Sequence, residues 1–100
     1  MLTLNIVTQE MRDMLRIKHT KLDAELEELK EACLTDLHLC GVNIIPKDDK
    51  LARAALRLYL RWQENYNGEA ERYAKAYEGV KVAMSLAEEY KGGADSVNAK

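Results

Sequence analysis

The sequence predicts an all-α protein, a small bundle of four or five helices. Three long segments repeat apolar residues every three or four positions, which is the period of an α-helix and not the alternation of a strand. The chain has one proline, Pro46, and only five glycines, so these segments contain few residues that break a helix. Its 100 residues, 47% hydrophobic and 32% charged, suffice for one modest core with a solvated surface. We expect a flexible N-terminal arm over residues 1–7, a helical domain over residues 8–91 and a flexible tail over residues 92–100.

The first seven residues place apolar side chains at alternate positions, as in an extended segment that packs on one side. These side chains are Leu2, Leu4 and Ile6. The same residues also fit a frayed lead-in to the first helix. That helix is predicted from Gln9 to about Ile17, with Thr8 as its N-cap. Its inward side chains are expected to be Met11, Met14 and Leu15.

The most regular pattern in the chain predicts a second helix from Lys21 to Cys40. Its apolar stripe at helical spacing consists of Leu22, Leu26, Leu29, Cys33, Leu37 and Cys40. Thr20 and Asp23 resemble a capping box at the start of this helix, and Gly41 supplies its stop.

The sequence offers no candidate for catalysis or for cofactor binding. It contains no glycine-rich phosphate loop, no HExxH or CxxC motif and no nucleophile elbow. Cys33 and Cys40 are the only cysteines, and seven residues of straight helix would separate them by about 10 Å, too far for a disulfide. Neither His19 nor His38 has a second histidine or a cysteine four residues on, and a stable metal site needs three or four convergent ligands. We therefore expect packing roles for both cysteines, and a protein that is not an enzyme and needs no cofactor.

The connection after the second helix carries Ile44 and Ile45 directly before Pro46. Two adjacent β-branched residues in a loop either tuck beneath the helices or dock into a neighbouring protein, and we favour tucking because apolar residues often staple a helix start. Asp48 or Asp49 is expected to cap the following helix, where a carboxylate also meets the positive end of the helix dipole.

The segment from Asp48 to Tyr66 predicts a central helix with apolar side chains on two sides. One stripe, the predicted core face, consists of Leu51, Ala55, Leu58, Trp62 and Tyr66. The nearly opposite side carries Leu56 and Leu60, and the row between the two carries Arg53, Arg57 and Arg61. A helix that is apolar on opposite sides is either central in its own domain or also meets a partner subunit.

The arginine row of this helix has two interpretations. Its side chains either meet acidic groups of a partner or the phosphates of DNA, or they form a solvated face that pairs with glutamates of the second helix. We favour the solvated face for most of the row and expect one arginine at an interface, where arginine is enriched. Trp62 shares its stripe with leucines, so it is interpreted as a core residue and not as a platform for stacking bases.

A turn at Asn67-Gly68 ends the central helix, and a helical pattern resumes from Glu69 to Lys91. Its predicted inner face consists of Tyr73, Tyr77, Val80, Met84 and Ala87. Gly79 interrupts this segment at a cost of about 1 kcal/mol relative to alanine, so the pattern fits either one kinked helix or two shorter ones. For the whole chain, the predicted core residues are Leu26, Leu29, Leu37, Leu51, Leu58, Trp62, Tyr77 and Met84.

The overall charge limits the classes of partner. The chain has 15 basic and 17 acidic side chains and a formal net charge of -2, whereas general nucleic-acid binders carry a marked basic excess. No apolar run approaches the ~20 residues that cross a bilayer, and the N-terminus lacks the pattern of a signal peptide. We therefore expect no membrane partner, and a chain that is cytoplasmic when it is made.

Three segments of the chain match the pattern of a known family in the same order. From Met14 to Ala32, a Leu-Arg-Ile signature, a polar linker and an Asp-Ala start lead into a long amphipathic helix. From Ala55 to Tyr66, an alanine-containing helix ends in an aromatic-rich Trp-Gln-Glu-Asn-Tyr pattern, and Gly79-Val80-Lys81 is similar to the start of the family's last helix. Together these segments resemble the small head-tail connector proteins of long-tailed phages, adaptor or head-completion proteins that are also described as DNA-packaging proteins.

The resemblance implies a structural adaptor that forms a ring, usually a dodecamer, beneath the phage portal and extends the DNA channel toward the tail. It implies assembly in the cytoplasm of the bacterial host and a final place in the virion neck. The implied partners are further copies of the chain, the portal protein, a stopper or tail-completion protein, and genomic DNA that passes without sequence-specific binding.

A ring requires each subunit to present two different surfaces to its neighbours. The candidate subunit or portal contacts are Leu56 and Leu60, the arginines Arg53, Arg57 and Arg61, the loop residues Ile44 and Ile45, and the arm residues Leu2, Leu4 and Ile6.

Two other functions fit the same sequence. A small helical regulator would bind nucleic acid through the arginine row, with an affinity that falls steeply with salt. An assembly chaperone would share the fold and the surfaces of a connector but would stay out of the finished particle.

Overall fold

A computed structural model describes residues 2–92, and these residues form four α-helices, two short 3₁₀ turns and no β-strand. The α-helices are α1 (Thr8–Met14), α2 (Asp23–Leu39), α3 (Lys50–Gln63) and α4 (Ala70–Leu86), and the 3₁₀ turns are η1 (Tyr66–Gly68) and η2 (Glu88–Tyr90). The prediction of an all-α protein is confirmed. The expected C-terminal tail, apart from Gly92, lies outside the described residues.

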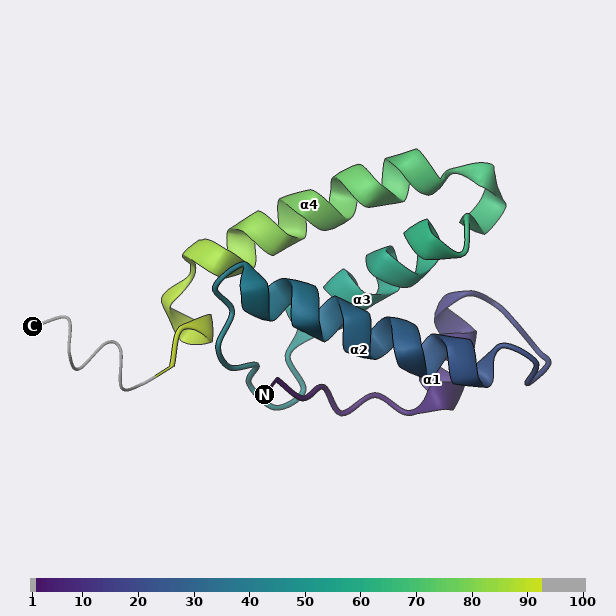
Figure 1. The fold of residues 1–100 in the computed structure, drawn as a ribbon, viewed down its shortest axis with the longest axis horizontal. Helices are drawn as coiled ribbons and strands as arrows, with labels where there is room; N and C mark the ends of the chain where they lie inside the picture. The colour runs from purple at the N-terminus through teal and green to yellow at the C-terminus, as the bar shows by residue number, and fades with distance from the viewer. Residues whose placement is uncertain (1, 93–100) are drawn as a thin grey trace, which may run out of the picture.

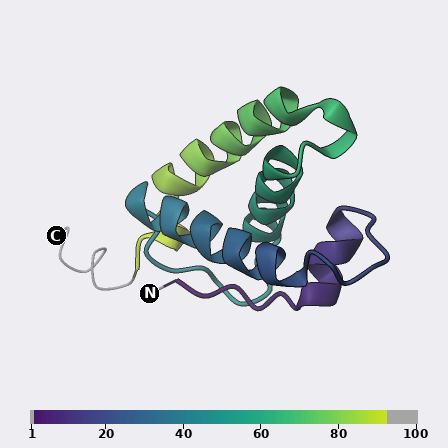
Figure 2. The ribbon, with the colours of Figure 1, turned by 45° about the vertical axis from the view of Figure 1, so that its right-hand side comes forward.

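Helix α3 is the centre of the fold, since it packs against α1, α2 and α4. Figures 1 and 2 show α3 and α4 as an antiparallel hairpin closed by η1, with α2 crossing the open end of this hairpin and α1 at the N-terminal end of α2. The two apolar sides predicted for α3 are therefore explained by its central place within one chain.

Side chains and turns set the ends of the helices. The carboxylate of Asp49 caps α3, because its Oδ2 accepts hydrogen bonds from the Ala52 amide at 2.9 Å and from the Tyr90 hydroxyl at 2.7 Å. Gly41 ends α2 with a φ of +109°, and the Val42 amide then donates to the Leu37 carbonyl at 3.0 Å.

Helix α1 begins one residue earlier than predicted, with Val7 in the N-cap position. The Val7 amide donates to the Glu10 carboxylate at 3.1 Å, which satisfies one free donor of the first turn. The Thr8 hydroxyl, predicted as the cap, instead donates to Glu27 Oε2 at 2.6 Å and so ties α1 to α2.

Helix α4 runs without a break through Gly79, which decides between the two arrangements that the sequence left open. The helix ends at Leu86, and the backbone becomes extended at Ala87, with a ψ of 136°. Gly79 is exposed, and a Cβ added there would meet no atom within 4 Å. No close approach within the described residues therefore requires glycine at this position.

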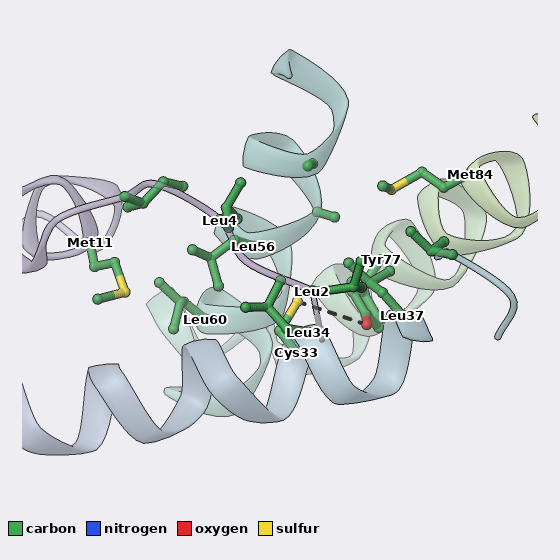
Figure 3. Close-up of a cluster of buried hydrophobic side chains, with 14 of the residues drawn as sticks. Leu2, Leu4, Met11, Cys33, Leu34, Leu37, Leu56, Leu60, Tyr77 and Met84 are labelled. Atoms are coloured by element: carbon green, nitrogen blue, oxygen red, sulfur yellow. Dashed lines mark hydrogen bonds between the residues drawn. The ribbon is translucent and has the colours of Figure 1, made fainter. Parts of the chain in front are cut away.

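The structure corrects the predicted faces of α3. Leu56 and Leu60 are fully buried with Ala52 and Ala55, so they belong to the core and not to a subunit interface. Figure 3 shows Leu56 and Leu60 inside the buried cluster, beside side chains of α1 and α2. Leu51 is 36% exposed and does not belong to the core, because it lies in the first turn of α3, roughly 140–180° around the helix from the buried Leu56 and Leu60.

The other predicted core residues lie in or against the core. Leu26, Leu37, Tyr77 and Met84 are fully buried. Leu29, Leu58 and Trp62 are partly buried and pack against this cluster.

The N-terminal arm packs along the core of its own chain, as its alternating pattern suggests. Leu2, Leu4 and Ile6 are all buried, whereas the intervening Thr3 and Asn5 are exposed. Figure 3 shows Leu2 and Leu4 against side chains of α2 and α3. The prediction that these three residues contact the portal is therefore wrong, since an apolar side chain that is buried in its own core has no surface left for a partner.

In the connection between α2 and α3, one isoleucine tucks beneath the helices and the other is exposed. Ile45 packs against the core, while Ile44 is 46% exposed. The amides of Asn43 and Ile44 both donate to the Tyr90 carbonyl, at 2.7 and 3.1 Å, so η2 holds the connection in place. Ile44 thus remains a candidate for a contact with another protein.

Candidate interaction surfaces

A groove lies between α1 and α3 where the arginine row of α3 faces the end of α1. Its volume is about 370 Å³, and it is lined by Glu10, Asp13, Met14, Arg16, Arg53, Arg57 and Arg61. We call it the arginine groove. Four guanidinium groups face two carboxylates here, so the groove has a net positive charge.

The three arginines of α3 have different roles in this groove. Arg53 forms an ion pair with Glu10, and this contact lowers the pKa of the Glu10 carboxyl. Arg61 donates from Nε to the Met14 carbonyl at 3.0 Å, and its guanidinium lies 4.6 Å from the ring centre of Tyr66. These two arginines hold α1 on α3, which differs from the predicted pairing with glutamates of the second helix.

Arg57 is the one member of the row that is exposed. It forms no hydrogen bond or ion pair with any described residue. Its guanidinium is free to bind a carboxylate or phosphate of a partner. The structure therefore brings the predicted arginines together and leaves Arg57 as the one available for an interface.

A second groove lies between α2 and α4, and Tyr59 and Trp62 of α3 form part of its lining. Its volume is about 430 Å³, and it is lined by Ala32, Thr35, Asp36, Leu39, Tyr59, Trp62, Glu78 and Lys81. We call it the aromatic groove. The rings of Tyr59 and Trp62 meet edge to face with their centres 5.5 Å apart, and Leu39 at the rim is 79% exposed. An apolar floor with a charged rim is typical of a surface that binds another protein.

A polar network at the edge of the aromatic groove joins α2 to α4. The Tyr77 hydroxyl donates to Asp36 Oδ2 at 2.7 Å, and Lys81 Nζ contacts the same oxygen at 3.0 Å. Lys81 also pairs with Glu78 at 3.1 Å. Sequence analysis missed this network because its members meet only after α2 and α4 have packed together.

Cys33 completes the buried side of this network. Its thiol donates to the Tyr77 hydroxyl across 3.9 Å, as the dashed line in Figure 3 shows. Burial raises the pKa of the Cys33 thiol to about 12, so the sulfur stays protonated at neutral pH and is a poor nucleophile. A packing role for Cys33, as expected from the leucine stripe, fits this environment.

The two grooves lie on different sides of α3. At about 100° per residue, Arg57 is separated from Tyr59 and Trp62 by roughly 140–160° around the helix axis. The chain therefore presents a basic groove on one side of its central helix and an aromatic groove on the other.

The end of α3 also carries a carboxylate pair. Glu64 Oε2 is buried and has no hydrogen-bond partner among the described residues. Burial, together with a hydrogen bond to Glu25 and the charge of that residue, raises the pKa of the Glu64 carboxyl to about 7. This pair is a local pH-sensitive feature of the contact between α2 and α3.

The described residues hold no group of three or more histidine, cysteine, aspartate or glutamate side chains placed to bind a metal ion. Within residues 2–92, no helix has the length and apolar character needed to span a bilayer. Comparison with models of protein families, with curated proteins and with solved structures gives no match to this chain.

Proposed function

We propose that this chain is a structural head-tail connector of a long-tailed phage. In this proposal copies of the chain form a ring beneath the portal, extend the DNA channel and provide the attachment surface for a stopper or tail protein. Support comes from the sequence segments that resemble the connector family and from the all-helical fold, in which the first segment runs from the end of α1 into α2 and the second falls on α3. The third segment departs from the family pattern, because Gly79 lies in the middle of α4 and not at a helix start.

The observation that carries the proposal is the pair of unlike grooves on the two sides of α3. A closed ring is built from head-to-tail contacts, in which each subunit offers two different surfaces. The chemistry of the grooves is complementary, because Arg57 of one subunit can stack on Tyr59 or Trp62 of the next and pair with a carboxylate at the rim. The subunit interface is therefore assigned to the two grooves in place of Leu56 and Leu60.

The test compares two single variants that alter one groove each. Arg57→Glu reverses a charge in the arginine groove, and Leu39→Glu places a charge at the rim of the aromatic groove. Both residues are exposed, so both variants should fold with wild-type helicity by circular dichroism. Lys21→Glu, an exposed charge change outside both grooves, is the matched control.

We expect the wild-type chain and Lys21→Glu to form closed rings with a central hole, seen by light scattering and negative-stain imaging, either alone or with the portal protein as template. Each groove variant should lose the rings, since every joint between identical copies contains the altered surface. An equal mixture should give pairs and no rings, because only one intact joint can form between the two variants. Rings that persist in both variants would contradict this interface.

The same variants separate the connector from a nucleic-acid-binding regulator. A regulator would lose its salt-dependent binding to duplex DNA in Arg57→Glu and be unaffected by Leu39→Glu. A connector should lose ring formation in both. Analysis of the protein content of purified virions distinguishes a connector from an assembly chaperone, which would be absent from the particle.

A further inference from the structure

The outer side of α4 carries an apolar face that no described residue covers. At helical spacing this face consists of Ala76, Gly79, Val82, Ala83 and Leu86, all of them exposed. Val82 is 50% exposed and Leu86 is 74% exposed. The inner side of the same helix already packs into the core through Tyr73, Tyr77 and Met84. The apolar residues of the outer face therefore do not contribute to the core of this chain.

Charged side chains stand at the two ends of this face and differ in sign. Lys75 and Arg72 lie at its N-terminal end, and the exposed Glu88 and Glu89 follow directly after its C-terminal end. Arg72 already pairs with Glu69, whereas Lys75 and Glu88 form no ion pair within the described residues. The order along the chain is therefore a basic end of α4, its apolar face and an acidic turn that follows the helix.

We infer that α4 of one copy packs against α4 of a second copy in antiparallel orientation, about a two-fold axis near the middle of the helix. Such a contact uses the same surface on both subunits. The pairs Gly79–Ala83 and Ala76–Leu86 are both centred on position 81 of α4, so one axis brings both pairs together. The same axis sets Lys75 near the end of the partner's helix, which Glu88 follows. A parallel arrangement would instead set Lys75 against Lys75.

The side-chain sizes fit this orientation. Gly79 of one copy faces Ala83 of the other, so the two backbones approach closely, and Leu86 faces the small Ala76. The glycine, which has no role in the contacts of its own chain, gains one at this interface. Because the surface is a single helix face, well below the ~1,200 Å² of a stable standard interface, the dimer is weak and depends on concentration.

This contact is independent of the proposed ring, since it involves neither groove. Its test is sedimentation velocity over a dilution series of the full chain. Lys75→Glu and Glu88→Lys should each raise the dissociation constant by about tenfold or more, because each places two like-charged pairs across the two-fold axis. An equal mixture of these two variants should form a mixed dimer with close to wild-type affinity, since both cross-contacts then join opposite charges.

Val82→Glu should abolish the dimer and leave the helicity unchanged. Lys21→Glu, which makes the charge change of Lys75→Glu at an exposed site outside α4, should leave the dimer intact. A chain that stays monomeric at every concentration overturns the inference, as does a dimer that ignores Val82→Glu. Failure of the mixed dimer overturns the antiparallel arrangement, whereas a permanent monomer leaves another protein as the occupant of this face. The ring variants tested on a Val82→Glu background report the grooves alone, so failure of one proposal is distinct from failure of the other.

Discussion

Glu64 at the end of α3 has a carboxylate that no described basic side chain pairs with. Its Oε2 is buried without a hydrogen-bond partner, and Glu25 lies close enough to share a proton with it. The pKa of the Glu64 carboxyl is raised from its ordinary value of 4.5 to about 7 in the folded chain. The folded state thus binds more protons at Glu64 than the unfolded state between these two values. The contribution of Glu64 to stability is therefore fully present below pH 4.5 and is lost as the pH rises through 7.

We predict that Glu64→Gln removes this loss of stability between pH 5 and pH 8. The raised pKa corresponds to at most about 3 kcal/mol, and solvent screening of a partly exposed side chain reduces this to ~1 kcal/mol. Urea unfolding at the two pH values measures the difference, with the exposed Glu71→Gln as control. A wild-type chain as stable at pH 8 as at pH 5 would show that the carboxylate pair is solvated.

At the scale of single elements, α4 contains one residue that weakens it. Gly79 adopts helical backbone angles in the middle of a continuous helix, although nothing in the described chain requires glycine there. Gly79→Ala should therefore raise the free energy of unfolding of the dilute monomer by up to about 1 kcal/mol. The measurement is urea unfolding below the concentration at which the chain self-associates.

The matched control for this substitution is Ala83→Gly, one turn further along the same exposed face. It should lower the free energy of unfolding by about the amount that Gly79→Ala raises it. If Gly79→Ala destabilises the monomer instead, the helix is distorted at residue 79 and the continuous α4 is incorrect.

The elements differ in how far the sequence determines them. The range of α2 was predicted to within two residues at each end, because its leucine stripe and Gly41 act within the helix itself. The sequence does not determine the buried side of α3, because the stripe with Trp62 and the opposite side with Leu56 and Leu60 are both apolar. Small Ala52 and Ala55 are fully buried where neighbouring helices approach, and Leu51 is not. Which side of a central helix is covered depends on three other helices.

At the scale of the whole molecule, the N-terminal arm is an integral part of the core. Leu4 and Ile6 are at most 9% exposed, and Lys30 Nζ contacts the Ile6 carbonyl at 3.3 Å. Replacing both apolar residues by alanine should lower the free energy of unfolding by at least ~3 kcal/mol. Thr3→Ala with Asn5→Ala, which changes the exposed side of the same arm, should cost less than ~1 kcal/mol.

Equal losses in these two double variants, measured by urea unfolding, would show that the arm contributes no buried surface.

The packing of separate segments also limits what the sequence reveals of the candidate sites. The arginine row and the exposed Ile44 were singled out from the sequence, whereas the aromatic groove requires residues of α2, α3 and α4 to meet. Sites made by three separate segments follow from packing and leave no local signal.

Tyr90 links the end of the fold to its middle. Its carbonyl accepts the amides of Asn43 and Ile44, and its hydroxyl binds the Asp49 carboxylate that caps α3. These bonds join residues more than forty positions apart in the sequence, so forming them requires closure of a long loop. A chain growing from the ribosome can form the early turns of α1 and α2 as they emerge, but the start of α3 lacks its Tyr90 partner until synthesis has passed the last helix.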